Sequence, residues 1–306
     1  MNLCYLFAGQ GSQFANMGQD LYRNEPLYKQ IVDSASETLD LNLADHNTFD
    51  NPKNTQVAIL TMSYAISKLL SKQLPTPKAM MGLSLGEYSA LVSSEALSFA
   101  SGLKLVHDRS MYMDEAGEDH PGSMAAVLKA TPDEVTSVCN EIDGVYPANF
   151  NTAKQTVIGG TKEGVKAAKK ALKAQKKIVI PLKVRVASHT PLMQSASDKL
   201  AKRLEKVTFD NPEVPVISNT IVKPFTKDNL KDTLVEQLVN PTHFMDDIKA
   251  VDSKDIDAFI EIGPGHTLSK LANKTAKGVP TYHVQDEKSL QEVVSKLGGE
   301  LNYGRK

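Results

Sequence analysis

Short apolar runs of strand length alternate with longer helical segments in the first part of the chain, and this alternation restricts the fold most. The runs "LCYLFAG" from Leu3 and "KAMMGL" from Lys78 each end at or beside a glycine, which is typical of buried strands. Between them, the apolar helical segment 56–70 is closed by Pro75 and Pro77. Strands that alternate with helices predict a parallel sheet covered by helices.

The same pattern continues on either side of a central segment with a different order. Outside this segment we expect helices at 17–39, from Leu85 onward, at 97–117, 192–207, 230–240 and 287–297, and strands at 215–219 and 257–263. Inside it we expect strands at 122–128, 145–151, 155–160 and 176–184, and helices at 131–142 and 161–175. That β-α-β-β-α-β order is the ferredoxin-like arrangement. We therefore predict an α/β fold with a large parallel-sheet domain, residues 1–117 and 186–306, and an inserted ferredoxin-like α+β subdomain, residues 118–185.

Charge and composition exclude several classes of function. The chain of 306 residues has a formal net charge of -1 and a pI of about 6.7, which does not favour nucleic-acid binding. No apolar run approaches the roughly 18 residues of a membrane span, and the first residues lack the basic region of a signal peptide. Because Cys4 and Cys139 both lie in apolar segments, we expect no disulfide and a cytoplasmic location.

A serine flanked by glycines lies where a predicted strand meets a predicted helix. Gly82-Leu83-Ser84-Leu85-Gly86 fits the pattern G-x-S-x-G. In that context a sharp turn exposes the serine hydroxyl, and the start of the helix offers free N–H groups to an oxyanion. The alternative is a glycine-rich turn without chemistry, but both flanks favour a nucleophile.

A serine nucleophile requires a base, and two of the seven histidines are candidates. His189 and His266 each follow a predicted strand, where the sites of α/β proteins collect. The spacing does not choose between them, because the members of a catalytic triad are neighbours in space and not in sequence.

Arg109 is unusual because it shares a helix face with Leu105 and Met113. An arginine on an apolar face either pairs with a buried carboxylate or binds one from a ligand. The residues alone favour the internal ion pair.

These motifs together resemble one family over essentially the whole chain: the malonyl-CoA:acyl carrier protein transacylases, including the acyltransferase domains of fatty acid and polyketide synthases. The matching segments, in order, are "GQGSQ", "NTQVAIL", "GLSLGEYSAL", "HDRSMYMDEA", "ANFNTAKQTVIGG", "VASHTPLM", "QLVNPTHF" and "IEIGPGHTL". The resemblance implies that the large domain is hydrolase-like and carries the ferredoxin-like insert.

The resemblance also implies a role for each matching residue. Ser84 is expected to be malonylated, with His189 as its base and Arg109 as the clamp for the free malonyl carboxylate. The backbone N–H groups of Gln10 and Leu85 are expected to form the oxyanion hole. The main-chain carbonyl of His243 is expected to orient the histidine base.

Four positions depart from residues that many family members carry. Histidine is common where Leu83 stands, and glutamine or arginine where His243 stands. An aromatic residue is common where Ser188 stands, and lysine where His266 stands. Ser188 adjoins the expected base, so it bears on the width of the acyl pocket.

The implied activity is that of an [acyl-carrier-protein] S-malonyltransferase in fatty acid synthesis. It moves malonyl from malonyl-CoA to the phosphopantetheine thiol of acyl carrier protein through a malonyl-serine, with ping-pong kinetics. We expect no metal, no bound cofactor and a monomeric protein. Fourteen basic and three acidic residues lie between Lys154 and Lys206, which predicts a basic surface for the carrier protein.

Three alternatives remain open. The first is a serine esterase that uses Ser84 and His266 with a separate acid. The second is a non-catalytic subunit that binds acyl carrier proteins. The third is a related transacylase that serves a malonate decarboxylase or a polyketide pathway.

Overall fold

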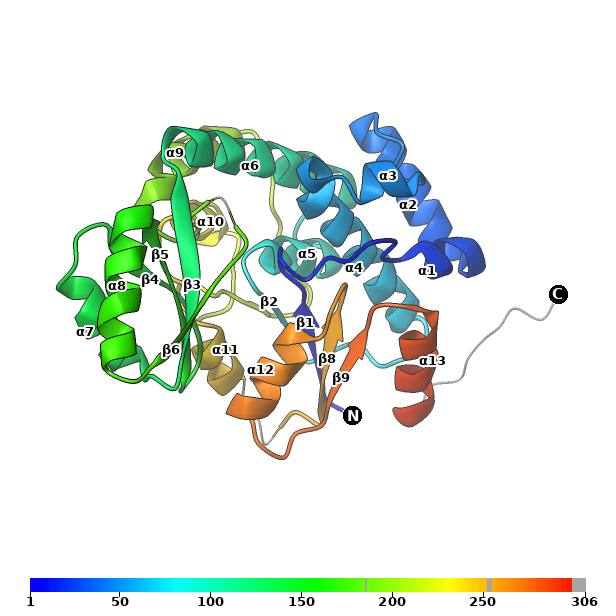
Figure 1. Ribbon diagram of the computed structural model, residues 1–306. Helices are drawn as coiled ribbons and strands as arrows, with labels where there is room; N and C mark the ends of the chain where they lie inside the picture. Colours follow the sequence, from blue (N-terminus) through cyan, green and yellow to red (C-terminus); the bar gives the residue numbers. More distant parts are fainter. Residues whose placement is uncertain (185, 252–254, 299–306) are drawn as a thin grey trace.

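A parallel five-stranded sheet forms the centre of the larger part of the molecule (Figure 1). The computed structural model describes residues 1–184, 186–251 and 255–298. The strand order is β7 (Val216–Ile217), β2 (Ala79–Gly82), β1 (Leu3–Phe7), β8 (Ala258–Ile262) and β9 (Thr281–Val284). All neighbouring strands run parallel, so their carboxyl ends meet at one edge of the sheet.

Helices cover both faces of this sheet, as the alternating sequence pattern predicts, and further helices pack on those. The helices of this part are α1 (Gln19–Asn24), α2 (Pro26–Leu39), α3 (His46–Phe49), α4 (Thr55–Ser71), α5 (Leu85–Ser93), α6 (Phe99–Asp119), α9 (Gln194–Leu204), α10 (Leu230–Glu236), α11 (Phe244–Ala250), α12 (Thr267–Thr275) and α13 (Glu287–Lys296), with short 3₁₀ turns at Pro52–Asn54 and Pro191–Met193. In the described part of the chain, no helix has the length and apolar character needed to cross a membrane.

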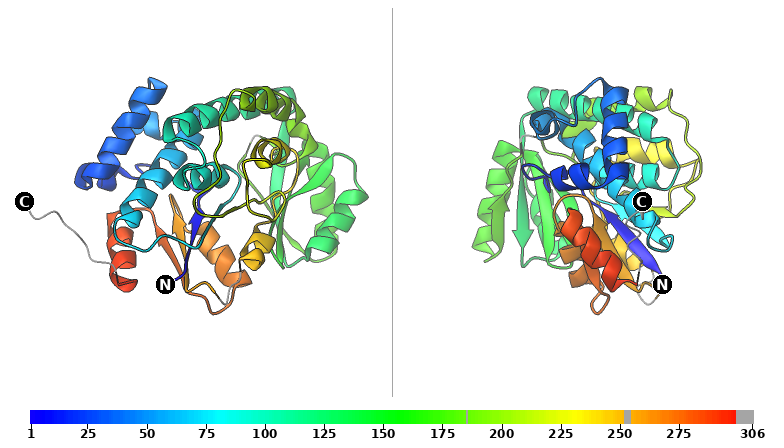
Figure 2. Two further views of the ribbon diagram at one scale, coloured as in Figure 1. Left: turned by 180° about the vertical axis from the view of Figure 1, so that it is seen from behind. Right: turned by 90° about the vertical axis from the view of Figure 1, so that its right-hand side faces the viewer.

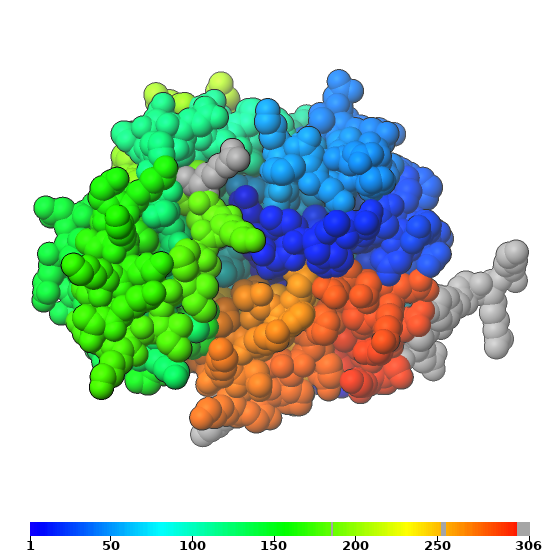
Figure 3. Space-filling model, in the orientation of Figure 1, coloured from blue at the N-terminus to red at the C-terminus, as the bar shows by residue number. Residues whose placement is uncertain are grey.

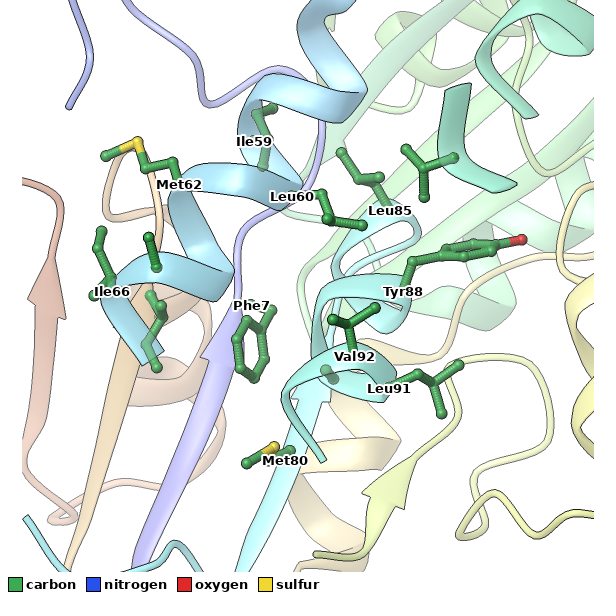
Figure 4. Close-up of a cluster of buried hydrophobic side chains, with 14 of the residues drawn as sticks. Phe7, Ile59, Leu60, Met62, Ile66, Met80, Leu85, Tyr88, Leu91 and Val92 are labelled. Atoms are coloured by element: carbon green, nitrogen blue, oxygen red, sulfur yellow. The ribbon is translucent and has the colours of Figure 1, made fainter. Parts of the chain in front are cut away.

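The core explains why the central strands read as continuous apolar runs. On one face Phe7 and Met80 belong to a buried cluster beneath α4 and α5 that also contains Ile59 and Leu85 (Figure 4). On the other face, a second cluster packs beneath α11 and α12. Every residue of β1 is buried because both faces are covered, so the edge at the carboxyl ends of the strands is where polar side chains of a site can gather.

A separate antiparallel sheet forms the second part, at one end of the molecule (Figure 2). Its order is β4 (Val145–Thr152), β5 (Gln155–Thr161), β3 (Gly122–Leu128) and β6 (Ile178–Pro181), with helices α7 (Pro132–Asn140) and α8 (Lys162–Ala174). This order confirms the ferredoxin-like prediction. Its surface is the green region of Figure 3, beside the blue and orange surfaces of the larger part.

The second sheet is joined to the larger part by main-chain hydrogen bonds. The N–H of Phe150 donates to the carbonyl of Thr242 at 2.7 Å, and the N–H of Thr242 donates to Ala148 at 2.9 Å. The exact division at residues 118 and 185 stays a prediction, and Arg185 lies outside the described residues.

Several predicted elements differ from the structure. The helix expected at 17–39 is two helices, because Pro26 cannot continue the hydrogen bonding of a preceding turn. Helices α11 and α12 and strand β9 were not predicted. The first three residues of β9 are only partly buried, so it lacks the apolar run that marks a central strand.

Candidate active site

Ser84 lies at the turn between β2 and α5, in the strained backbone that the motif predicts. Its φ is 56° and its ψ is -103°, a region that L-residues seldom adopt. The flanking glycines permit this turn: a Cβ on Gly82 would lie 2.1 Å from the carbonyl carbon of Gly86, and a Cβ on Gly86 would lie 2.1 Å from the oxygen of Phe7. The two glycines therefore allow three backbone segments to meet below the hydroxyl.

The guanidinium of Arg109 reaches that hydroxyl from α6. Its Nη2 donates to Ser84 Oγ at 3.0 Å and to Gln237 Oε1 at 3.1 Å, and its Nη1 donates to Gln56 Oε1 at 2.6 Å. Arg109 is 1% exposed, and these three partners are uncharged. The internal ion pair favoured by the residues alone is therefore absent among the described side chains, and a buried cation faces the serine.

Tyr88 and solvent exclusion complete the surroundings of this cation. The Cζ of Arg109 lies 5.1 Å from the centroid of the Tyr88 ring, close enough for a cation–π contact. Burial lowers the pKa of the guanidinium from its ordinary value, and Nε has no hydrogen-bond partner in the described part of the chain. A carboxylate ligand would supply both the missing charge and a further acceptor.

His189 is buried beside Gln237. Its ring Nδ1 lies 2.7 Å from the main-chain oxygen of Gln237. The main-chain N–H of His189 donates to the carbonyl oxygen of Leu238 at 3.0 Å. Burial lowers the pKa of His189 to about 4; the hydrogen bond to Gln237 opposes this shift, and the charge of Arg109 adds to it. The ring is therefore neutral at pH 7. Because a carbonyl oxygen can only accept, Nδ1 carries the proton and donates it to Gln237, which leaves Nε2 unprotonated and able to act as a base.

The carbonyl that holds His189 is not the expected one. His243 was expected to supply it, but the His243 oxygen accepts from the N–H groups of Asp246 and Asp247 at the start of α11. Gln237 supplies the carbonyl instead, three residues before the turn at Asn240. The expectation for His243 was wrong because the chain turns into α11 at that residue.

His266 lies elsewhere in the fold. It is exposed at the start of α12, and its ring centroid lies 5.4 Å from that of His283. Among the described residues neither histidine has a hydrogen bond to Ser84, but His189 is joined to it through Gln237, whose main-chain oxygen lies against the His189 ring and whose Nε2 donates to the carbonyl of Ser84. The geometry therefore favours His189 over His266 as the partner of the serine.

The two segments expected to form the oxyanion hole lie against each other. A Cβ on Gly9 would lie 2.6 Å from the carbonyl oxygen of Leu83, so the loop that carries Gln10 packs against the serine turn. Within the described residues, no hydrogen bond uses the N–H of Gln10 or of Leu85. Two free donors on touching segments fit the recognition of a developing negative charge.

Four polar residues of the site were not singled out from the sequence: Gln56, Glu87, Asn219 and Gln237. All four are buried. Asn219 Oδ1 accepts from the N–H of Ser84 at 3.0 Å, and Gln237 Nε2 donates to the carbonyl of Ser84 at 3.1 Å. An amide at the carboxyl end of the predicted strand 215–219 was the available signal for Asn219.

No cluster of three or more metal-binding side chains occurs among the residues that the structure describes. The expectation of a reaction without metal or cofactor stays a prediction.

The fold and this site together define an acyltransferase. A family model described as "Acyl transferase domain" matches residues 4–298, and the chain belongs to that family. It is 36% identical to the malonyl CoA-acyl carrier protein transacylase of Bacillus subtilis (strain 168), over 96% of this chain and 97% of that protein.

Solved structures show the same relationship. The chain is similar to MCAT from Streptococcus pneumoniae, with a TM-score of 0.92 and 38% identity over 97% of this chain and 100% of that one. It is also similar to the structure of a type II PKS acyl-carrier protein in complex with its malonyl-transacylase, with a TM-score of 0.91 and 33% identity over 97% of this chain and 100% of that one. The predicted family membership and fold class are confirmed.

Proposed function

We propose that this chain transfers malonyl from malonyl-CoA to the phosphopantetheine thiol of an acyl carrier protein, for fatty acid synthesis. The observation that carries the proposal is the buried Arg109 guanidinium, held 3.0 Å from the hydroxyl of Ser84 by uncharged partners. An ester on Ser84 with a free carboxylate at its far end supplies an anionic hydrogen-bond partner, which the guanidinium lacks among its direct partners. The names of the relatives support the same substrate and partner.

The first half-reaction forms the malonyl-enzyme. Ser84 Oγ attacks the thioester carbonyl while Nε2 of His189 takes the hydroxyl proton. The N–H groups of Gln10 and Leu85 bind the oxyanion of the tetrahedral intermediate. When the carbon–sulfur bond breaks, the proton on His189 passes to the coenzyme A thiolate.

The second half-reaction repeats these steps with the carrier thiol as the attacking group. His189 takes the thiol proton, sulfur attacks the malonyl ester, and the ester bond to Ser84 Oγ breaks. The same proton returns to Ser84, so the enzyme ends unchanged. Because these residues account for every bond and proton, the proposed reaction uses no metal or bound cofactor.

Arg109 sets the acyl preference in this scheme. A malonyl carboxylate forms charge-assisted hydrogen bonds to the guanidinium, whereas an acetyl group leaves the buried cation without an anionic hydrogen-bond partner. The difference is on the order of 2–4 kcal/mol for hydrogen bonds between charged groups in a buried site. Malonyl is therefore the favoured donor.

Exposed lysines on α8 support a docking role in the basic surface between Lys154 and Lys206. Lys166, Lys170 and Lys173 are exposed on this helix, and these exposed cations suit an acidic carrier protein. On α9, by contrast, Arg203 donates to Asp108 at 2.5 Å, so part of the basic charge is already paired.

We also propose a monomeric, cytoplasmic enzyme. One chain supplies every side chain assigned above, and its two buried cysteines are unpaired. A reducing compartment suits two unpaired cysteines.

Transfer of labelled malonyl to holo carrier protein tests the proposal. The wild type and His266→Ala are expected to form a labelled enzyme and to pass the label on, whereas Ser84→Ala and His189→Ala are not. An esterase based on His266 would lose labelling in His266→Ala instead. A non-catalytic carrier-binding subunit would show no labelled enzyme in the wild type, and either result would refute the proposal.

A further inference from the structure

The side-chain amide of Gln237 connects the nucleophile with the cation. Its Oε1 accepts from Arg109 Nη2 at 3.1 Å, and its Nε2 donates to the carbonyl of Ser84 at 3.1 Å. Its main-chain oxygen also holds the ring of His189. One residue thus contacts the three groups assigned to the reaction, and the orientation of its amide decides what Arg109 meets.

An amide has two ends of similar shape, so something must select its orientation. The buried carboxylate of Glu87 does this, because its Oε2 accepts a hydrogen bond from Gln237 Nε2. Both oxygens of Glu87 accept hydrogen bonds, and above pH 7 the ionised carboxylate has no proton to donate, so only the NH₂ end of the amide can then face it. The oxygen end of Gln237 is then directed at Arg109, where a reversed amide would place a donor against a cation.

Glu87 is itself held rigidly. It is fully buried on α5, one turn after Ser84, and its Oε1 accepts from the main-chain N–H of Asn219. Burial raises the pKa of Glu87 to about 7, and hydrogen bonds from Asn219 and Gln237 and the charge of Arg109 oppose the shift. No step of the proposed reaction uses this carboxylate, although its burial costs free energy.

We propose that Glu87 is a positioning residue that sets the preference for a malonyl donor by fixing the amide of Gln237 against Arg109. This inference rests on the proposed function. With its acceptor in place, the guanidinium is held where the carboxylate of a serine-bound malonyl group meets it. Without that acceptor, the guanidinium can move away from the position in which it binds the malonyl carboxylate, and the preference for malonyl over acetyl is reduced.

The test compares malonyl-CoA and acetyl-CoA as donors for Glu87→Gln. This variant keeps the shape but offers both a donor and an acceptor, so the amide of Gln237 loses its single orientation. For malonyl-CoA we expect KM to rise and kcat/KM to fall about tenfold or more, as for the loss of one hydrogen bond to a charged group. For acetyl-CoA we expect a smaller change, so the ratio of kcat/KM for malonyl-CoA to kcat/KM for acetyl-CoA (the donor ratio) falls.

Asp247→Asn is the matched control. Asp247 is an equally buried carboxylate in the same network, but it binds Asn219 Nδ2 at 2.5 Å and has no hydrogen bond to Gln237. We expect this variant to change both donors alike and to leave their ratio as in the wild type. An equal loss for both donors in Glu87→Gln would mark a merely structural carboxylate and would overturn the inference.

A double variant tests whether Glu87 acts through Gln237. In Gln237→Ala the amide is gone but the main-chain carbonyl at His189 remains, so Glu87→Gln should lower the donor ratio no further. A second, additive loss in the double variant would contradict the mechanism.

Folding and the underlying activity are checked separately. If circular dichroism shows that Glu87→Gln does not fold, Glu87→Asp replaces it. The shorter side chain keeps the negative charge but is too short to accept the hydrogen bond from Gln237. A normal donor ratio in Glu87→Asp would then overturn the inference. A wild type that transfers no malonyl would refute the proposed function instead, so the two failures are distinguishable.

Discussion

Arg109 Nη2 and Ser84 Oγ lie 3.0 Å apart, although the two residues are 25 positions apart in the chain and belong to different elements. The serine lies at the turn after β2, and the arginine projects from α6, which packs against α4 and α5. This contact places a permanent cation beside the hydroxyl that would carry the acyl group. The charge of the acyl tail therefore becomes the property that the site can distinguish.

Replacement of Arg109 by lysine should weaken the choice between donors. Lysine keeps the charge, but its single ammonium group cannot donate hydrogen bonds to Gln56, Gln237 and a carboxylate at the same time, as the planar guanidinium can. We expect kcat/KM for malonyl-CoA to fall about 10–100-fold, the range for one or two hydrogen bonds to a charged group, with little change for acetyl-CoA. Arg203→Lys, at an arginine paired with Asp108, is the control and should leave both values unchanged.

Gly86→Ala should damage the fold of the serine turn. The new Cβ would lie 2.1 Å from the backbone oxygen of Phe7, which cannot move without displacing β1. We expect a loss in unfolding free energy on the order of 4 kcal/mol or more, measured by chemical denaturation. The control, Gly278→Ala, has no atom within 4 Å of the new Cβ, and its positive φ should cost only about 1 kcal/mol.

His189 should remain neutral far below the usual range of histidine. Its pKa is lowered to about 4 by burial, so its ring C–H signals in NMR should titrate near that pH. Because histidine in the unfolded chain binds its proton at a pKa of 6.5, the unfolded state gains stability first as the pH falls. His189 thus contributes stability above pH 6.5 that is lost toward pH 4. A ring that titrates at 6.5 would contradict the buried geometry.

Glu87 should make stability depend on pH in the opposite direction. Its pKa is raised from 4.5 to about 7 by burial, so the folded state holds a proton that the unfolded state has already released. The contribution is complete below pH 4.5 and is lost as the pH rises through 7. In Glu87→Gln, unfolding free energies measured between these values should decline less with rising pH than in the wild type. The charge of Glu87 also raises the pKa of the buried Asp247, so the variant should weaken the pH dependence of that carboxyl in the same direction.

Charge reversal on α8 should weaken transfer to the carrier protein without affecting acylation by malonyl-CoA. We expect the double variant Lys166→Glu and Lys170→Glu to raise KM for the carrier several-fold at low salt, with a smaller effect at high salt because ions screen surface charges. The control is Lys72→Glu, an exposed lysine after α4 and outside the basic stretch. An unchanged KM for the carrier would exclude this helix from the docking surface.

The sequence predicted the local features of the site best. The turn around Ser84 depends on five adjacent residues, and glycine, serine and a following helix are all visible in the sequence. The order of elements likewise predicted both sheets, since a parallel and a ferredoxin-like sheet differ in how strands and helices alternate. Strand β9 was missed because an edge strand with a half-buried pattern resembles a loop.

The sequence predicted contacts between distant segments less well. The residues alone favoured an internal carboxylate as the partner of Arg109, and only the family resemblance suggested a ligand. Sequence periodicity shows which face of a helix a residue lies on, but not which groups pack against that face. The carbonyl beside His189 was assigned to His243 and belongs to Gln237, since the path of the chain between them depends on packing against α11. Glu87 lies inside a recognised motif, yet only the fold brings Gln237 to it.

Ser84 and His189 both have a left-handed backbone, with φ of 56° and 63°. Glycine would relax at either position, so the fold without its two proposed reactive side chains is expected to be relieved of part of its backbone strain. Selection for stability alone would therefore favour replacement of the two reactive residues first. A relative that has lost the activity should carry glycine at these two positions and have a higher melting temperature than an active relative.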